Sequence, residues 1–576
     1  MVGNSKRILA IAMAGVLLVG SAATGLTDSN AASKVKISKN KLTLGVGEST
    51  KLSLKNVKKK KAKKATWKSS NTKVATVKKK AAKAVVTAVG TGKATITAKL
   101  AGKKYTCKVT VTDPYAGVKK FLKNAEGIKS VEEIKQDPSN QIMYARKYLL
   151  TFEQPLDYKN PSAGTFPQRV VLGLKDDAMV NVLETQGYCL QDKQGLPFTK
   201  NAPSDADTCL GANDINIEHR FFGDSRPADM TNTETKYWEY HTAENAANDY
   251  HRIYTTLAPL LGEKWVASGV SRGGEMTNVY GYYFPDDMDV YMPYVAPCMT
   301  GLQVKQFYEN VYTTIGDDRF GKEEAKKRRD LLMSFQVELM KNKADILPYY
   351  EKYIANKGLT YQPHVKTDVL FDINVFEFAA QIWQYDKWEL LNQAGGIENV
   401  MAMPETTADE KANKLIAELT LLITGQGPED WSVNGVAWPY YVNAATTYGQ
   451  YHYSFSYLRE AMEKAGVANT LSVTPEMEDG LLQSLVFNDA QRTAFTYDDT
   501  FVKALVNSVK TTTAKHLMIY GLSDPWYAVR IPDATDNPNV KIFVNPNQPH
   551  SAGIANMPED MQADIIKVLR EWLELG

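Results

Sequence analysis

The chain has 576 residues, of which 44% are hydrophobic, 10% are aromatic and four are cysteines. That length corresponds to two to four domains of about 100–200 residues each, and the composition excludes a disordered chain and a disulfide-stapled miniature fold. The net charge of +3 is a cancellation, because residues 33–112 hold 23 Lys, no Arg and one acid, Glu48, while the residues after 112 carry −20. A segment of charge +22 is therefore joined to an acidic one, and each needs its own explanation.

The first 32 residues have the layout of a secretory signal peptide. Lys6 and Arg7 precede an apolar run of 12 residues, 8–19, and small residues follow up to Ala32. The run is shorter than the roughly 18 residues that span a bilayer, although a retained membrane anchor is the alternative. We expect an exported, soluble protein, secreted or associated with the cell wall outside the cell, with no transmembrane segment in the mature chain.

Residues 33–112 predict a small all-β domain. Short alternating runs at 34–37, 51–54, 74–77, 84–86, 94–98 and 108–111 are separated by turn residues at the spacing of a sandwich. The stretches 42–47 (LTLGVG), 67–77 (WKSSNTKVATV) and 90–98 (GTGKATITA) resemble the bacterial immunoglobulin-like domain of group 2. The resemblance implies a spacer or adhesive module.

The lysine excess of this segment, including residues 58–61 and 78–80, creates a strong positive field. One hypothesis is weak retention at anionic cell-wall polymers. The alternative is a solvated spacer that the lysines keep soluble. Nucleic acid is not an expected partner, because the segment has no Arg and few aromatic residues for base stacking.

Beyond residue 113 aromatic and acidic residues become common, and the pattern changes to strands and helices. A helical connector is expected at about 115–135, and strands are expected at 145–152, 166–175, 180–184, 214–218 and 264–269. Residues 242–261 have the apolar spacing of an amphipathic helix. Strands that alternate with helices predict an α/β sheet.

The sequence Gly269-Val270-Ser271-Arg272-Gly273 is the main chemical signal. A G-x-S-x-G string is weak by itself, but here a predicted strand enters it and a predicted helix leaves it. That context is typical of a nucleophile elbow, which makes Ser271 the candidate nucleophile. A structural Gly-Ser turn is the alternative.

A serine hydroxyl needs a base and an acid, which follow it in the order acid, His in α/β-hydrolases. His550 is the one of seven histidines in the C-terminal loop that this order requires, after the expected strand 540–544. Asp524 ends the preceding strand, 517–521, and is the expected acid, with Asp533 and Asp536 as fallbacks. The other six histidines are expected to be packing or surface residues.

Motifs in a fixed order run from about Tyr144 to the C-terminus. They are 152–158 (FEQPLDY), 164–169 (GTFPQR), 218–227 (EHRFFGDSRP), 271–274 (SRGG), 284–287 (FPDD), 294–297 (YVAP), Glu377 with 383–385 (WQY), and 524–526 (DPW). Together they resemble the secreted bacterial serine tripeptidyl and prolyl aminopeptidases and, more distantly, the prolylcarboxypeptidase group.

The resemblance implies an α/β-hydrolase core with a helical cap, which suits the roughly 210 helix-rich residues between Pro297 and Leu517. The expected order is signal peptide 1–32, immunoglobulin-like domain 33–112, helical connector 113–140, core 141–300, cap 301–512 and core 513–576. The cap would form a chamber for chain ends, or merely buttress the core.

The implied reaction is acyl transfer from short peptides, with release of tripeptides from the N-terminus and a preference for Pro before the cut. His550 takes the proton of Ser271 and Asp524 supports the imidazole. The backbone amide of Arg272 is the expected first oxyanion donor, and an amide near Phe221 or Phe222 the second.

Substrate recognition rests on fewer residues. Trp526 is a candidate wall for proline, or a packing residue. Glu377 is the family-matched candidate to hold the free α-ammonium, and Glu275 and Asp386 are weaker candidates.

Cys189 and Cys209 lie 20 residues apart in a loop-like stretch and are expected to form a disulfide after export. Cys107 and Cys298 are expected to be unpaired and buried. No Cys or His spacing suggests a metal, and no cofactor is expected. Two rival functions remain, an esterase or lipase on the same fold and a wall-bound adhesin with a degenerate hydrolase domain.

Overall fold

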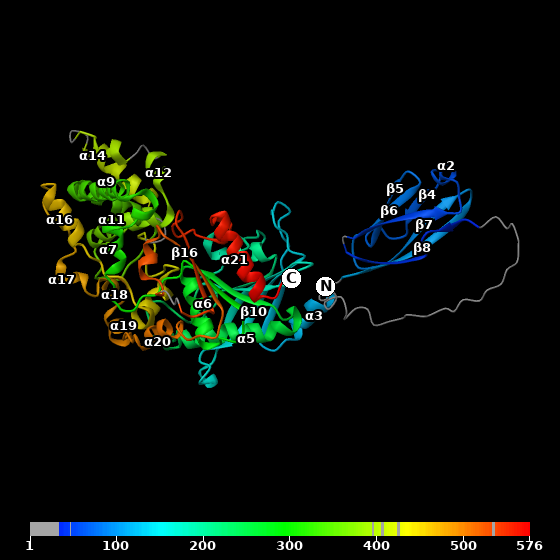
Figure 1. The fold of residues 1–576 in the computed structure, drawn as a ribbon, viewed down its shortest axis with the longest axis horizontal. Helices are drawn as coiled ribbons and strands as arrows, with labels where there is room; N and C mark the ends of the chain where they lie inside the picture. The colour runs from blue at the N-terminus through cyan, green and yellow to red at the C-terminus, as the bar shows by residue number, and fades with distance from the viewer. Residues whose placement is uncertain are drawn as a thin grey trace. The chain divides into compact units, whose positions relative to one another are not determined.

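The computed structural model describes residues 34–46, 48–113, 115–393, 397–404, 408–422, 427–532 and 536–576. The expected signal peptide, 1–32, and the fallback acid Asp533 lie outside these residues. The chain divides into two compact units, 1–125 and 126–576, which are described separately (Figure 1).

The first unit is the predicted β-sandwich. One of its sheets has the order β1-β3-β6-β5 and the other β2-β8-β7-β4. The strands are β1 (Lys36–Ile37), β2 (Lys41–Gly45), β3 (Ser49–Lys55), β4 (Thr66–Ser69), β5 (Ala75–Lys80), β6 (Lys83–Ala88), β7 (Gly92–Leu100) and β8 (Lys103–Thr112), with one short helix, α2 (Lys59–Ala62), between β3 and β4.

Alternation along the strands builds the core of this sandwich. In β7 the side chains of Ala94, Ile96 and Ala98 are buried, while Lys93 and Lys99 are exposed. Ala94 and Ile96 pack against Cys107, Val109 and other inward residues of both sheets, and Ala98 packs in a second cluster with Leu54 and Leu100. The period of two thus places the apolar residues inside and leaves lysines outside.

The connector differs from its predicted helical form. A helix, α3 (Ala116–Asn124), is present, but residues 128–133 form an edge strand, β9 (Ile128–Glu133), which pairs with β10 (Arg146–Pro155). The helix ends where Ala125 becomes extended, with ψ 133°, and Gly127 follows with φ +86°. Ile128 and Val131 of β9 are only partly buried, as an edge strand allows. The helical prediction for 113–140 is therefore wrong in its second half.

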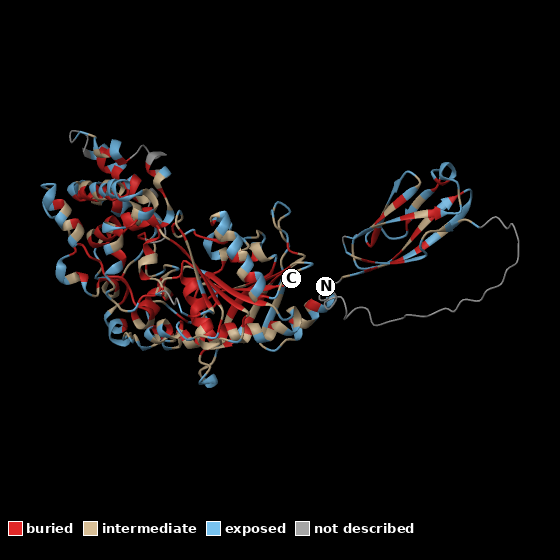
Figure 2. Cartoon of the chain, viewed as in Figure 1, coloured by how far each residue is buried: buried red, intermediate tan, exposed pale blue. Residues whose placement is uncertain are grey.

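A nine-stranded mixed sheet forms the centre of the second unit, in the order β17-β16-β15-β14-β12-β13-β11-β10-β9. Its remaining strands are β11 (Thr165–Leu174), β12 (Asn181–Thr185), β13 (Asn213–Ile217), β14 (Trp265–Val270), β15 (Val290–Tyr294), β16 (His516–Gly521) and β17 (Val540–Asn545). From β13 through β17 neighbouring strands are parallel. Figure 2 shows the central strands of this sheet buried, whereas the edge strands β9 and β17 are partly exposed. The α/β architecture is confirmed.

Helices cover both faces of the sheet. On β16, Leu517 and Ile519 pack with helix α21 (Glu559–Trp572), whereas Met518 and Tyr520 pack with helix α20 (Thr500–Ser508). The alternation of strand side chains explains why one apolar strand needs a helix on each side. Two further helices flank the nucleophile strand in sequence, α5 (Ala243–Leu261) and α6 (Arg272–Tyr283).

The cap is helical, as predicted, and gathers at one end of this unit in Figure 1. Its helices are α7 (Gln306–Thr313), α8 (Asp317–Phe320), α9 (Lys322–Lys341), α10 (Lys343–Lys357), α11 (Thr367–Tyr385), α12 (Trp388–Gln393), α13 (Ile397–Met401), α14 (Ala408–Leu422), α15 (Trp438–Asn443), α16 (Ser456–Lys464), α17 (Pro475–Glu478), α18 (Leu481–Val486) and α19 (Asp489–Ala494). Because α20 packs on the sheet, the cap ends before Thr500, earlier than the boundary at 512 expected from the sequence.

Candidate active site

Ser271 lies at a sharp turn between β14 and α6. Its backbone has φ 58° and ψ −122°, a strained conformation that lifts the side chain out of the sheet. The turn needs glycine on both sides, since a Cβ on Gly269 would lie 2.4 Å from the carbonyl of Gly273, and one on Gly273 would lie 2.6 Å from Thr185 O. The predicted strand-turn-helix geometry of the elbow is therefore present.

Asp524 and His550 form a close pair at the same edge of the sheet. His550 Nδ1 lies 2.6 Å from Asp524 Oδ2, and both side chains are buried. Asp524 follows β16, His550 follows β17 and Ser271 follows β14, so all three come after the carboxyl ends of parallel strands. With Nδ1 donating to the carboxylate, Nε2 carries the lone pair, and it has no hydrogen-bond partner within the described residues.

The two candidate oxyanion donors from the sequence differ in whether their amides are free. The amide of Arg272 is in the first turn of α6, where helical amides have no intrahelical acceptor. The amides of Phe221 and Phe222 are already used, because they donate to Ser225 O at 2.7 Å and to His219 O at 3.2 Å. The prediction that Phe221 or Phe222 supplies the second donor is therefore contradicted.

A different loop lies beside the Arg272 backbone. Gly187 follows β12, and a Cβ at this position would lie 2.3–2.7 Å from Cγ, Cβ and the carbonyl carbon of Arg272. Neither Gly187 nor Tyr188 uses its amide in a backbone hydrogen bond among the described residues. The Gly187–Tyr188 loop is thus the better source of a second donor, and only the proximity in three dimensions reveals it.

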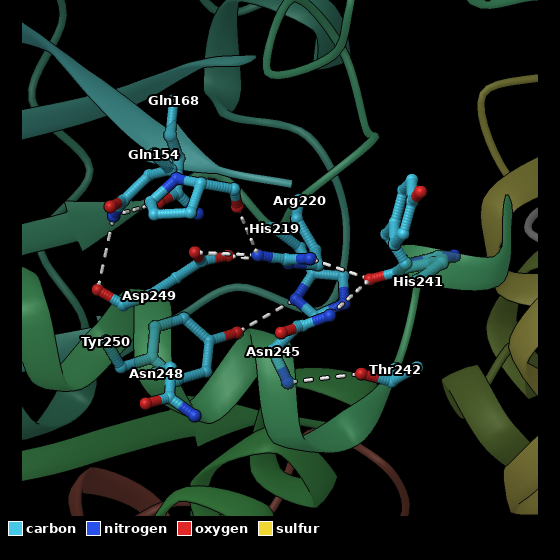
Figure 3. A network of polar contacts seen from close by, with 12 residues as sticks. Gln154, Gln168, His219, Arg220, His241, Thr242, Asn245, Asn248, Asp249 and Tyr250 are labelled. Carbon is cyan, nitrogen blue, oxygen red and sulfur yellow. Dashed lines mark hydrogen bonds and ion pairs between the residues drawn. The ribbon is translucent and has the colours of Figure 1, made fainter. Parts of the chain in front are cut away.

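The stretch 218–223 holds this loop in place. Glu218 forms an ion pair with Arg169 and accepts the amide of Leu190 at 2.9 Å, while the amide of His219 donates to Tyr188 O at 3.1 Å. The buried Arg220, two residues after Glu218, forms an ion pair with Asp249 of helix α5 at 2.7 Å, as Figure 3 shows. The stretch therefore acts as a buried support for residues 187–190.

The histidines of this region are packing residues. His219 hydrogen-bonds Tyr250 at 2.9 Å through Nδ1, and its ring lies 5.5 Å from that of His241 (Figure 3). Burial, together with nearby cationic groups, keeps the pKa of both imidazoles well below the usual value, so neither is charged near neutral pH.

Arg272 connects the elbow to the cap through its side chain. Its guanidinium is buried, pairs with Glu275, and donates to Asn443 Oδ1 at 2.8 Å. It also lies 4.2 Å from the ring centre of Tyr448. Because Glu275 is engaged with Arg272, it is not available to hold a substrate amine. Asp386 is excluded in the same way by a pair with Arg319 at 2.9 Å.

An aromatic cluster joins the cap to the Asp524–His550 pair. The ring of Trp526 lies 6.4 Å from that of His550, 4.8 Å from Phe307 and 5.8 Å from Tyr451. Cap helix α11 reaches the same place, because His550 donates its backbone amide to Gln384 O at 3.2 Å. Trp526 is therefore both packed and adjacent to the predicted base.

Glu377 lies on α11 two turns before Gln384, so both are on one face of that helix. It is fully buried, and Tyr451 donates to its Oε1 at 2.8 Å. Oε2 has no hydrogen-bond partner within the described residues. Burial raises the pKa of Glu377 to about 7, against the hydroxyls of Tyr308, Tyr451 and Tyr453, which lower it.

Asp430 is a second carboxyl in this region that sequence reasoning missed. Burial and the charge of Glu429 raise its pKa to about 7. The negative charge of Asp430 in turn raises the pKa of Glu377 and of Tyr188, which lies in the loop beside Arg272. The charges of Asp430 and Asp524 both raise the pKa of Tyr385. The cap thus carries two carboxyls of raised pKa, Glu377 and Asp430, and neither forms a salt bridge among the described residues.

The cysteines do not form the expected disulfide. All four are free, with Cys107 and Cys298 buried as predicted. Cys189 lies near Glu218 and Asp192 in the loop after β12, whereas Cys209 lies on α4 (Asp205–Leu210) and packs with the group on the α21 face. The two cysteines lie in different surroundings, so the disulfide predicted from their closeness in sequence is wrong. Among the described residues no group of His, Cys, Asp and Glu is arranged to hold a metal ion.

Comparison with known proteins places these features in a family. Residues 117–575 match the PS-10 peptidase S37 family, and residues 31–111 match the bacterial Ig-like domain of group 2. A relative, the prolyl tri/tetrapeptidyl aminopeptidase of Streptomyces mobaraensis, is 26% identical over 493 residues, which cover 85% of this chain and 89% of that protein.

Solved structures that align with the chain include a proline iminopeptidase of Mycobacterium smegmatis, at 11% identity and a TM-score of 0.28, covering 73% of this chain and 98% of that one. A tannin acyl hydrolase of Aspergillus niger aligns at 14% identity and a TM-score of 0.33, covering 79% and 86%. The elbow and the Asp524–His550 pair agree with the family match. The chain belongs to the PS-10 peptidase S37 family, as a serine aminopeptidase whose α/β-hydrolase core follows an Ig-like domain in the sequence.

Proposed function

We propose that this protein is an exported peptidase that removes short peptides, chiefly tripeptides, from free N-termini, with a preference for Pro before the cut. The observation that carries the proposal is the Asp524–His550 hydrogen bond of 2.6 Å at the sheet edge that also carries Ser271. The cap adds the buried Glu377 and the half-buried Asp430. An esterase would have no use for carboxyls that select a cation.

In the proposed reaction, Nε2 of His550 accepts the proton of Ser271 Oγ as the oxygen attacks the peptide carbonyl. Asp524 fixes the imidazole tautomer and stabilises its positive charge, and the proton then passes to the leaving amine. Water repeats the sequence to release the acyl group. The amide of Arg272 and one from Gly187–Tyr188 stabilise the oxyanion, each contributing about 10²–10³ in kcat.

The free α-ammonium of the substrate is held by Glu377 and Asp430. A buried carboxylate without a cation is unfavourable, and a positively charged ligand relieves that cost. Two observations support this assignment: Oε2 of Glu377 has no hydrogen-bond partner within the described residues, and the charge of Asp430 raises the pKa of Glu377. A fixed distance between these acids and Ser271 would set the length of the released fragment.

The proline preference draws support from Trp526 and its aromatic neighbours, since proline is rigid, apolar and lacks an N–H. It also matches the name of the Streptomyces mobaraensis relative, a prolyl tri/tetrapeptidyl aminopeptidase. Among the helices that the structure describes, none is long and apolar enough to cross a membrane. The signal-like residues 1–32 support export, and the basic module supports retention of the enzyme at the anionic cell wall.

A digest of a peptide library by the purified chain, read by mass spectrometry, tests the proposal. We expect N-terminal fragments of three residues ending in Pro. Ser271→Ala is expected to lower the rate by roughly 10⁶ and to abolish labelling by a fluorophosphonate. Preferred hydrolysis of short acyl esters over prolyl peptides would contradict the peptidase assignment.

A further inference from the structure

The lysines of the Ig-like unit are concentrated at one end of its sandwich. Hairpin β5–β6 turns between Lys80 and Lys83, which are paired partners, and hairpin β7–β8 turns between Leu100 and Lys103. Strand β3 ends at the first hairpin, because Ser53 pairs with Lys83. These registers place the ends of three strand pairs together.

The two sheets share this end. Leu54 of β3 packs in one cluster with Ala98 and Leu100 of β7, so the β5–β6 and β7–β8 hairpins lie at the same end of the sandwich. Helix α2 is there as well, since it connects β3 to β4, and Thr66 at the start of β4 pairs with Lys99. We name this end the lysine tip. It comprises Lys34, Lys36, Lys55, Lys58, Lys59, Lys60, Lys61, Lys63, Lys64, Lys78, Lys79, Lys80, Lys83, Lys99, Lys103 and Lys104.

The tip holds 16 of the 23 lysines of residues 33–112, and every one is exposed. Within the described part of this unit none of them forms a salt bridge. Glu48, the one acid of residues 33–112, lies in the β2–β3 turn at the other end, where it accepts the amide of Gly45. A surface of one sign with no internal counterion attracts a polyanion.

We propose that the lysine tip is a docking surface for a phosphodiester polymer of the cell wall. The inference deepens the proposed wall retention and rests on the proposed export, but it does not depend on the peptidase chemistry. It assigns polymer binding to one end of the Ig-like domain rather than to the basic charge of the whole domain.

The chemistry of the tip favours this partner over other polyanions. Lysine ammonium groups are compact point charges that bind any phosphate without bidentate geometry, whereas base recognition uses Arg and aromatic stacking, and residues 33–112 have no Arg. A bilayer surface is expected to engage apolar side chains. The exposed large apolar residues described for this unit, Val46 and Val89, lie in the turns at the opposite end.

The test compares two full-length variants of equal charge. The tip variant carries Lys60→Gln, Lys61→Gln, Lys80→Gln and Lys103→Gln, and the base variant carries Lys41→Gln, Lys73→Gln, Lys93→Gln and Lys108→Gln, which lie farther along the strands. Binding to immobilised poly(glycerol phosphate) is measured between low and physiological salt.

We expect the tip variant to bind about tenfold or more weaker at low salt and to show a smaller slope of log K against log salt, by about 0.7–0.9 for each lysine–phosphate ion pair that the substitutions remove. The base variant is expected to bind like the parent chain. Equal weakening in both variants would show that the binding surface is not confined to the lysine tip. Equally strong binding of the parent chain to vesicles of anionic phospholipid or to a polycarboxylate would contradict a wall phosphodiester as the specific partner.

Hydrolysis of a soluble tripeptide substrate by the same variants separates this inference from the proposed function. All variants are expected to retain parental activity, and Ser271→Ala is expected to retain polymer binding. If the parent chain hydrolyses the peptide but does not bind the polymer, the lysine-tip inference fails alone. If it binds the polymer but does not hydrolyse the peptide, the proposed peptidase function fails alone.

Discussion

Arg272 donates a hydrogen bond of 2.8 Å to the side-chain oxygen of Asn443, and so connects the residue after the predicted nucleophile to the cap. Asn443 in turn donates to the backbone oxygen of His241 at 2.7 Å, which fixes the orientation of its amide. The elbow, the cap helix α15 and the core loop before α5 are thereby held in one buried network. Cap position and oxyanion geometry are coupled through a single side chain.

Replacing Asn443 tests that coupling. Asn443→Leu leaves a buried donor and a buried acceptor unpaired and is expected to destabilise the fold by about 1–3 kcal/mol. It should lower kcat more than it raises KM, because the backbone amide of Arg272 is the proposed oxyanion donor. Asn443→Asp keeps the acceptor for Arg272 and is expected to retain most of kcat. If both variants affect KM alone, the network serves substrate binding instead.

The close approach of Gly187 to Arg272 gives a second prediction. Gly187→Ala forces the loop away from the Arg272 backbone and is expected to lower kcat by about 10² with little change in KM. Gly301→Ala is the matched control, because a Cβ there meets no atom within 4 Å. Steady-state kinetics on a prolyl tripeptide amide measures both, and unchanged kcat in Gly187→Ala would remove this loop from the oxyanion site.

Glu377 and Asp430 predict how activity depends on the substrate amine. Glu377→Gln and Asp430→Asn are each expected to reduce kcat/KM on free-amine peptides by about 10–100-fold, the value of a charged hydrogen bond, and to spare N-acetylated peptides. Glu351→Gln is the control, since Glu351 is an exposed acid on cap helix α10. Equal losses on free and blocked peptides would contradict amine recognition.

The same two acids predict a pH effect with a definite sign. Because their pKa values are raised to about 7, both are neutral below that pH and charged above it. KM for free-amine peptides should therefore rise as the pH falls below about 7. In the double variant Glu377→Gln with Asp430→Asn, this rise should disappear, and a persistent rise would assign the effect to another group.

A buried acid cluster in the core predicts a pH dependence of stability. Burial raises the pKa of Glu184 to about 7 and of Asp214 to about 6, and Glu184 Oε1 has no partner within the described residues. A raised folded-state pKa means that the native state holds the proton more tightly. The unfolding free energy should therefore fall as pH rises from about 4.5 to 7, by on the order of 3 kcal/mol for Glu184.

Glu184→Gln removes that dependence. Denaturant unfolding at pH 5 and pH 8 should show a smaller difference in midpoint for this variant than for the parent chain. Exposed Glu571→Gln is the control and should leave the difference unchanged. If Glu184→Gln shows the parental difference, Glu184 ionises as an ordinary surface acid.

Much of the fold follows from the chain itself. The expected helix at 242–261 matches α5 within one residue, because its apolar spacing is long and regular. Strand β9 is not predicted, since Ile128 and Val131 among charged residues give too weak an alternation for an edge strand. The predicted cap boundary lies too late, because α20 has the same amphipathic pattern whether it packs on a sheet or on other helices.

The order of the two domains, the elbow at Ser271, and the choice of Asp524 and His550 as candidate partners followed from the chain, because glycine spacing and chain order around a nucleophile elbow are local or topological properties. The structure places Asp524 and His550 2.6 Å apart. Only the three-dimensional structure shows that Phe221 and Phe222 use their amides within their own turn and that Gly187 lies against Arg272. It also shows that Cys189 and Cys209 are unpaired and that the charge of Asp430 acts on Glu377. Those facts depend on which loops meet in space, and a single chain does not encode such meetings in any local pattern. The charge of the Ig-like domain is likewise plain in the composition, but its concentration at one end follows only from the register of the strands.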